Sequence, residues 1–116
     1  MPVIRHQINP IGKQRLTHQG RFSKEAKRWY AYRDIIRAHN VQVPESGAMI
    51  IFYKPMPKSW SAKKKEEMAG KPMQQTPDVD NLLKGLLDAV YNDDACVFDI
   101  RVRKLWAYQG AIEIIT

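Results

Sequence analysis

Four prolines and a glycine in the middle of the 116-residue chain constrain its fold more than any other feature. They lie between Lys54 and Val79 together with a run of three lysines; these residues are Pro55, Pro57, Pro72, Pro77, Gly70, Lys63, Lys64 and Lys65. Because proline interrupts helices and inner strands, the stretch predicts a long connection with room for one short helix, at about Ser61–Met68. A connection of this length in a small domain is usually functional or disordered. Its lysines favour a mobile arm, at about residues 54–78, that contacts phosphate.

Regular structure is predicted before this arm. Val3–Ile8 shows a weak strand pattern, and Ala48–Tyr53 is a short, β-rich apolar run typical of a buried strand. Between them, Ser23 is a good N-cap for a helix that runs to about His39. The buried face of that helix is expected to consist of Ala26, Trp29, Tyr30 and Ile36.

The clearest helix follows the arm and extends from Val79 to Tyr91. One stripe of this helix is apolar and consists of Leu82, Leu83, Leu86, Leu87 and Val90. The opposite stripe carries Asn81, Lys84 and Asp88. A helix with this division of side chains is expected to pack its leucines against a sheet or a second helix.

Two strands are predicted after this helix. Apolar and polar residues alternate from Cys96 to Arg103, with Cys96 and Phe98 on the apolar side, as on a half-buried strand. Gln109–Gly110 signals a turn, after which Ala111–Ile115 is expected to pair back as a final strand. The whole pattern predicts one α+β domain over residues 1–116, with a small, mostly antiparallel or mixed sheet and two main helices.

Composition excludes several classes of protein. Cys96 is the sole cysteine, so an internal disulfide framework and a cysteine-based zinc site are excluded. The longest apolar run, Ala48–Tyr53, is too short to span a membrane. The N-terminus has no apolar core of the signal-peptide kind, and we therefore expect a cytoplasmic protein without a membrane partner.

Charge is divided unevenly along the chain, whose net charge is +7. Residues 1–75 hold fifteen Lys and Arg against five Asp and Glu, whereas residues 76–116 hold four against seven. A basic surface attracts a polyanion, and phosphate contacts give salt-dependent affinity for nucleic acid. The candidate nucleic-acid-binding residues lie in a basic loop and in the arm, and they are Lys13, Arg15, Arg21, Lys58, Lys63, Lys64 and Lys65. A merely solvated lysine face is the alternative.

The carboxylates of the acidic part fall in two pairs at the ends of the leucine-striped helix. Asp78 and Asp80 stand two residues apart at its start. If the chain is extended there, both side chains point to one side and could reach one divalent cation. Asp93 and Asp94 follow its end, about 18 Å away at 1.5 Å per residue. An acid of this second pair reaches the first only if the following strand runs back alongside the helix.

Carboxylates without nearby His or Cys favour Mg²⁺ or Mn²⁺ over zinc. Such ions neutralise phosphate, activate water and stabilise the leaving oxygen in phosphodiester cleavage. Lys84, one turn into the helix from Asp80, would hold a phosphate or stabilise the charge of the transition state. The alternative is structural: Asp78 and Asp80 cap the helix, and Asp93 and Asp94 form a turn.

Together these residues resemble the RusA family of Holliday junction resolvases, and most closely its phage and prophage branch. The resemblance is carried by Pro77-Asp78-Val79-Asp80-Asn81-Leu82-Leu83-Lys84, then Leu87-Asp88-Ala89, then Asp93-Asp94-Ala95-Cys96-Val97. The upstream segment Pro55-Met56-Pro57-Lys58-Ser59-Trp60-Ser61 also looks like that branch. The loop Lys13-Gln14-Arg15 is similar to the family's N-terminal basic motif, although Leu16 stands where a further basic residue is expected.

The resemblance implies a homodimer that cuts four-way DNA junctions and related branched DNA in recombination and repair, using Mg²⁺ or Mn²⁺. It assigns the three essential acids to Asp78, Asp80 and Asp94 and the important lysine to Lys84, with Asp93 as a further metal-ligand candidate. Water is the expected nucleophile. The rival interpretation is a non-catalytic, basic nucleic-acid-binding module. In a nuclease the three acids must come within metal-bridging distance in the folded chain, whereas in a binding module they need not.

Overall fold

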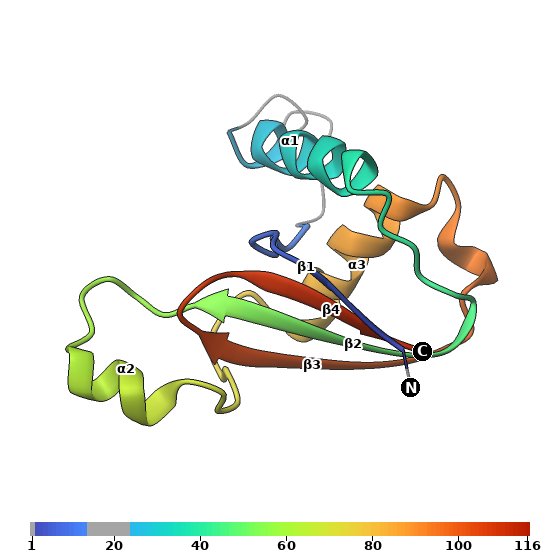
Figure 1. The fold of residues 1–116 in the computed structure, drawn as a ribbon. Coiled ribbons are helices and arrows are strands. Elements are labelled where there is room, and N and C mark those ends of the chain that lie inside the picture. The colour runs from blue at the N-terminus through green and yellow to red at the C-terminus, as the bar shows by residue number, and fades with distance from the viewer. Residues whose placement is uncertain (1, 14–23) are drawn as a thin grey trace.

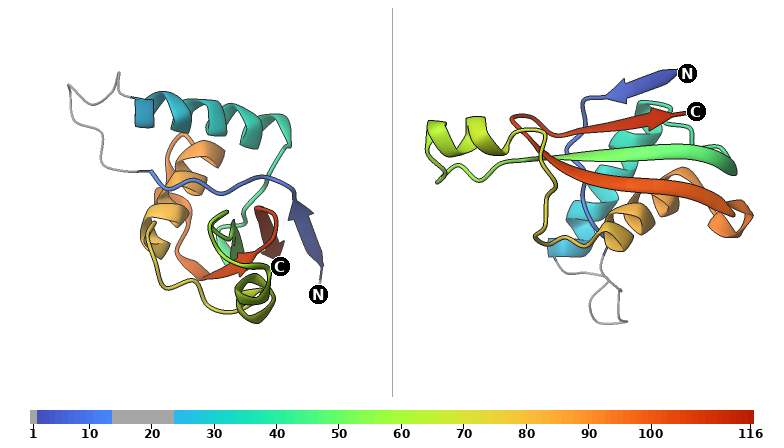
Figure 2. Two further views of the ribbon diagram at one scale, coloured as in Figure 1. Left: turned by 90° about the vertical axis from the view of Figure 1, so that its left-hand side faces the viewer. Right: turned by 90° about the horizontal axis from the view of Figure 1, so that it is seen from below.

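The computed structural model describes residues 2–13 and 24–116. Its elements are, in chain order, β1 (Val3–His6), α1 (Lys24–Ala38), β2 (Ser46–Pro55), α2 (Ala62–Met68), α3 (Val79–Val90), the 3₁₀ helix η2 (Asp94–Cys96), β3 (Asp99–Ala107) and β4 (Ala111–Ile115). Four strands form one sheet, and α1 and α3 cover one of its faces, while α2 projects beyond the strand ends (Figures 1 and 2). This arrangement confirms the predicted α+β class.

The sheet is mixed, with the strand order β1-β4-β2-β3. Strand β4 pairs antiparallel with both β1 and β2, whereas β2 and β3 run parallel. The prediction that Ala111–Ile115 pairs back on the preceding strand is therefore wrong, because β2 lies between them. Parallel neighbours require a crossover connection, and here the arm and α3 together supply it.

The main core lies between the sheet and the two covering helices. It contains Ile50 and Phe52 of β2, Leu82 and Leu86 of α3, and Ile112 of β4, all fully buried. The leucine stripe of α3 thus packs where the periodicity predicts. Among residues 2–13 and 24–116, no helix combines the length and the apolar character that a membrane crossing needs.

Helix α1 contributes a different aromatic residue to the core than its pattern predicts. Trp29 and Ile36 are buried as expected, but Tyr30 is exposed and Tyr32 takes the buried position. Tyr32 lies three residues after Trp29 and four before Ile36, so all three share one face of the helix. The predicted N-cap, Ser23, lies outside the described residues.

The segment after α3 also differs from its prediction. Cys96 ends the 3₁₀ helix η2 and is exposed, and Phe98 is 76% exposed, so neither belongs to the apolar side of a strand. Strand β3 begins only at Asp99, and its Ile100 and Val102 pack against the main core. The predicted alternation holds from Ile100 onward, but the 3₁₀ helix η2 takes the place of the first residues of the predicted strand.

The arm between β2 and α3 contains the predicted short helix. Helix α2 begins after Ser61, whose Oγ accepts a hydrogen bond from the Lys64 amide at 3.1 Å. A second hydrophobic cluster, formed by Met56, Met73 and Trp106 with Trp60 against them, joins the arm to the end of the sheet. The rings of Trp60 and Trp106 pack edge to face, with 5.0 Å between their centroids.

The returning part of the arm runs along the outer edge of β3. Backbone hydrogen bonds link Gly70 and Lys71 with Trp106, and Met73 with Lys104, and Pro72 forms an antiparallel bridge with Leu105. The arm that the sequence predicts to be mobile is therefore anchored to the sheet before it reaches Asp78.

Candidate functional site

Asp78 and Asp80 stand together at the N-terminus of α3. Asp78 occupies the N-cap position with an extended backbone, yet its carboxylate makes no capping hydrogen bond. Asp80 lies in the first turn of the helix, so the extended backbone considered for residues 78–80 stops at Asp78; both side chains are exposed. No described residue forms a hydrogen bond or an ion pair with either carboxylate. The geometry therefore does not support the alternative in which Asp78 serves only as a cap. The partial positive charge of the helix N-terminus nevertheless stabilises negative charge at this position.

Asp93 and Asp94 lie at the other end of α3. The Asp93 carboxylate accepts a hydrogen bond from the Ala95 amide at 3.0 Å and so caps η2, which matches the structural alternative for this residue. Asp94 is half-buried, and its carboxylate has no partner among the described residues. The 12 residues of α3 separate the two pairs by about 18 Å.

Within one chain, these acids do not form a single cluster. Residues 2–13 and 24–116 contain no group of three or more His, Cys, Asp or Glu side chains arranged to hold a metal ion. The strand after the turn does run back along α3, as the sequence allows, but it starts at Asp99. It therefore carries Lys104, rather than Asp94, to the neighbourhood of Asp78.

Lys104 is a residue of this site that sequence reasoning missed. Its ammonium donates hydrogen bonds to the carbonyl oxygens of Gln75, at 2.7 Å, and Pro77, at 2.9 Å. Both carbonyls belong to the segment that leads directly into Asp78. The sequence contains one indication of this role. Lys104 falls on the same side of the strand as Ile100 and Val102, where an apolar residue is expected.

The N-terminal segment packs against the other side of the start of α3. The Lys13 amide donates to the carbonyl of Asn81 at 3.1 Å. Gly85 faces this segment so closely that a Cβ on it would lie 2.6 Å from the carbonyl oxygen of Ile11. Trp29 of α1 donates its Nε1 hydrogen to the carbonyl of Gly85 at 3.2 Å. The first turns of α3 are thus held between residues 11–13, α1 and β3.

Two of the candidate lysines, Lys13 and Lys84, form ion pairs with the carboxylate of Asp88. Lys13 Nζ lies 3.0 Å from Asp88 Oδ2, and Lys84 Nζ lies 3.4 Å from the same oxygen. Lys13 also stands over the Trp29 ring, 4.1 Å from its centroid, and is only about one-fifth exposed. Lys13 is therefore engaged in packing, whereas the Lys84 side chain is 62% exposed and accessible to a ligand.

The comparison with known proteins decides the family. The model of the RusA endodeoxyribonuclease family matches residues 7–115, which is nearly the whole chain. This chain belongs to the RusA family. It is also similar to an uncharacterized protein, YqaN, of Bacillus subtilis (strain 168), with 42% identity over 71 residues that cover 54% of this chain. The matched region spans about half the length of that curated relative.

Most of the candidate DNA-binding residues of this RusA-family chain lie on the arm. Lys58, Lys63 and Lys64 are exposed and Lys65 is half-buried. Lys64 Nζ stands 4.2 Å from the centroid of the Trp60 ring, which connects the lysine run to the second hydrophobic cluster. Arg15 and Arg21 lie outside the described residues.

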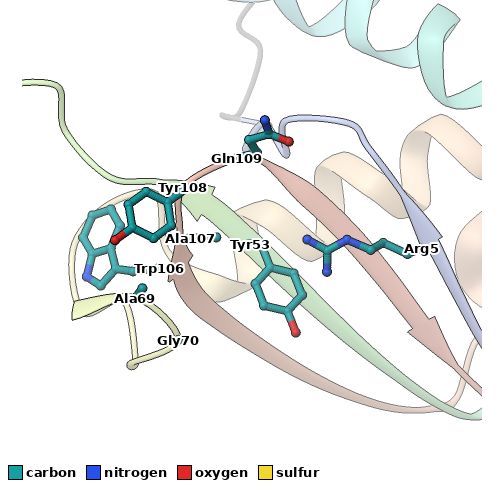
Figure 3. Close-up of a pocket in the computed structure, with 8 residues that line it drawn as sticks. All are labelled: Arg5, Tyr53, Ala69, Gly70, Trp106, Ala107, Tyr108 and Gln109. Atoms are coloured by element: carbon teal, nitrogen blue, oxygen red, sulfur yellow. The ribbon is translucent and has the colours of Figure 1, made fainter. Parts of the chain in front are cut away.

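The RusA-family chain also has an open pocket of about 350 Å³ where the arm meets the sheet (Figure 3). It is lined by Arg5, Tyr53, Ala69, Gly70, Trp106, Ala107, Tyr108 and Gln109. The pKa of Tyr53 is raised mainly by burial and, to a smaller extent, by its hydrogen bond to Glu113. None of the candidate acids lines this pocket, so it is not the site that the sequence predicts.

Proposed function

We propose that this protein is a Mg²⁺-dependent endodeoxyribonuclease that resolves Holliday junctions and related branched DNA, with Mn²⁺ able to replace Mg²⁺. The observation that carries the proposal is the match to the RusA endodeoxyribonuclease family over residues 7–115. The unengaged carboxylates of Asp78 and Asp80 at the start of α3 supply a suitable chemical centre within that framework.

The donors at this centre fit a hard divalent cation. Asp78 and Asp80 offer carboxylate oxygens that no described side chain occupies, and oxygen ligands are those that Mg²⁺ and Mn²⁺ prefer. These two residues would hold the ion, which supplies an activated water and neutralises charge on the scissile phosphate. Lys84, exposed one turn further along α3, would approach a non-bridging phosphate oxygen and stabilise the charge that develops there.

The position of Asp94 supports a shared site in a homodimer. Its half-buried carboxylate lies too far along α3 to reach Asp80 of the same chain. A two-fold axis that placed two copies of α3 side by side and antiparallel would bring Asp94 of one copy beside Asp78 and Asp80 of the other. Such a dimer has two sites related by symmetry, and a four-way junction has two strands to cut symmetrically.

The arm is the proposed DNA-binding surface. Lys58, Lys63 and Lys64 are exposed on it, and its returning segment leads into Asp78. Phosphates bound by these lysines would lie along the path that ends at the acids. This continuity favours one continuous DNA surface from α2 to the start of α3.

One observation favours the rival function, a non-catalytic nucleic-acid-binding module. Within one described chain, Asp94 does not come near Asp78 and Asp80. If no partner supplies the third acid, these carboxylates would serve only as surface charge and turn structure.

Cleavage of a synthetic four-way junction, with and without Mg²⁺, tests the proposal. We expect paired nicks from the wild type only when Mg²⁺ is present, and binding without cleavage from Asp80→Asn. Loss of one negative charge does not weaken attraction to phosphate, so this variant should bind at least as well as the wild type. Junction binding without any Mg²⁺-dependent cleavage by the wild type would establish the rival function.

Mixed dimers test the shared site. Asp80→Asn and Asp94→Asn homodimers should both be inactive. A dimer with one chain of each kind would contain one intact site, because the wild-type Asp80 and the wild-type Asp94 meet across the two-fold axis. Co-expression of the two variants should therefore restore nicking of a single strand. Inactive mixed dimers would show instead that each site draws its acids from one chain.

A further inference from the structure

We propose that Lys104 is a positioning residue for the candidate site, which it serves by holding the segment from Gln75 to Pro77 so that Asp78 and Asp80 face one ligand. The inference rests on the proposed function, because it assigns Lys104 a role toward the metal ion and phosphate of that site. Lys104 belongs to β3 and is separated from the acids by the whole of α3 in sequence, so no local motif contains it.

The contacts of Lys104 make it the anchor of this segment. Its ammonium bonds the carbonyl oxygens of Gln75 and Pro77, and its own carbonyl accepts a hydrogen bond from the Met73 amide at 3.1 Å. One residue thus fixes the returning arm at three points over five positions. Within the described chain, no other donor reaches the Gln75 or Pro77 carbonyl.

The segment has few other means of holding its shape. The next backbone hydrogen bond along the chain is the first of α3, from the Leu82 amide to the Asp78 carbonyl at 3.1 Å. Between this bond and the one at Met73, the backbone of residues 74–77 makes no described hydrogen bond to other backbone groups. On its other side, Pro77 faces Gly12, a position without a side chain, where a Cβ would lie 3.0 Å from Pro77 Cβ.

A lysine is chemically suited to this position. An ammonium has three donors on a flexible stem and can bond two carbonyls that differ in direction, whereas a guanidinium presents its donors in a fixed plane. Lys104 is half-buried, and its charge near the start of α3 also opposes the repulsion between the two neighbouring carboxylates. Removal of the ammonium would leave the Gln75 and Pro77 carbonyls without a donor from the protein and Asp78 free to turn away from Asp80.

The test compares Lys104→Met with a matched control, Lys54→Met. Lys54 is also half-buried on a strand of the sheet, and its ammonium also bonds two oxygens of a neighbouring segment, Pro10 O at 2.7 Å and Asn9 Oδ1 at 3.2 Å. Both variants should lose a similar amount of thermal stability. Only Lys104→Met should change the site, so cleavage and Mn²⁺ binding are measured well below the unfolding transition of each protein.

We expect Lys104→Met to lower the maximal cleavage rate and the Mn²⁺ affinity, the latter measured by titration without DNA, by about 10- to 100-fold, the range typical of residues that orient metal ligands. Junction affinity in the absence of metal should change less than twofold. Lys104→Arg should restore part of the loss, and Lys54→Met should retain the wild-type rate and Mn²⁺ affinity.

Three results would overturn the inference. Equal losses in Lys104→Met and Lys54→Met would show a general stability effect, and loss of junction affinity alone would make Lys104 a DNA contact. Unchanged Mn²⁺ affinity in Lys104→Met would remove its role toward the acids. If Lys104→Met does not fold, Lys104→Gln, which retains two donors without the charge, takes its place. A wild type that neither cuts nor binds Mn²⁺ would refute the proposed function itself and is thereby distinguished from these results.

Discussion

The ammonium of Lys13 lies between Asp88 and Trp29, 3.0 Å from the carboxylate oxygen of one and 4.1 Å from the ring centroid of the other. This contact joins the N-terminal segment to both α1 and α3, and it uses a lysine that the sequence assigns to DNA. The candidate DNA-binding residues are therefore of two kinds, those that hold the fold and those whose side chains are exposed.

Lys13→Ala should reduce stability more than it reduces DNA affinity. A surface ion pair contributes about 0.2–1 kcal/mol and a cation–π contact about 0.5–1 kcal/mol, so we expect a loss of about 0.7–2 kcal/mol. At roughly 3–6 °C for each kcal/mol in a domain of this size, the melting temperature should fall by roughly 2–12 °C, as measured by circular dichroism. The salt dependence of junction binding should not change. A lower slope without a lower melting temperature would place Lys13 on the DNA.

Gly85→Ala should destabilise the protein although alanine is the better helix former. In an exposed helix this change gains about 1 kcal/mol. Here the added Cβ would lie 2.6 Å from the Ile11 carbonyl oxygen, and this oxygen belongs to the backbone and cannot rotate away. Separation of the two segments should cost about 1–3 kcal/mol, which outweighs the gain in propensity. Chemical denaturation measures the net effect, and a more stable variant would contradict the close packing of residues 11–13 on α3.

Substitution of Lys63, Lys64 and Lys65 by alanine should weaken junction binding with little dependence on sequence. The slope of log affinity against log salt should fall by about one for each phosphate that the variant no longer binds. A variant that neutralises Lys24, Lys27 and Arg28, all exposed on α1, removes the same charge elsewhere and serves as the control. Equally weakened binding in the two variants would mean that net charge, rather than the arm, determines the affinity.

Lys84→Ala separates a structural role from a catalytic one. Its ion pair with Asp88 is exposed, at positions i and i+4, and such pairs contribute about 0.3–0.5 kcal/mol. Loss of one group that stabilises the charge of a transition state costs about 2.7–4 kcal/mol, which corresponds to a rate about 100- to 1,000-fold lower. We expect near wild-type stability and junction binding with a cleavage rate reduced to that extent. A wild-type rate in single-turnover cleavage would leave Lys84 as a surface helix residue.

Elements with a long, regular pattern were predictable from the sequence. The leucine stripe of α3 spans more than two turns, and its period identifies both the helix and its buried side. The short helix α2 was predictable because Ser61 supplies a cap and the flanking prolines limit its length. Both signals are local, and local signals suffice for a helix.

The order of the strands was not predictable in the same way. No residue near Gly110 indicates that β4 pairs with β1 and β2 rather than with β3. This pairing depends on which apolar faces the completed core must cover. Tyr30 and Tyr32 are a similar case: both fit a helix, and only the packing of α1 against α3 decides which ring is buried.

The sequence indicates the residues of the candidate site but not how the fold arranges them. Asp78 and Asp80 are close in sequence, and both lie at the start of α3. Lys104 and the position of Asp94 depend on how β3 returns along α3, which is a property of the fold. A lysine at a core-facing strand position is the one sequence feature that would have indicated Lys104.

The parallel pairing of β2 and β3 has a consequence for how this molecule comes into being. Residues 56–98 form a single excursion from the sheet, which includes the arm, α3 and all four acids of the two pairs. Strand β3 cannot take its place until that excursion has closed, and such closure over a long sequence separation is a slow event in folding. The edge of the sheet and the start of α3, with the lysine that joins them, are therefore completed together. A chain that has folded far enough to form the finished sheet has already placed Asp78 and Asp80 at the start of α3.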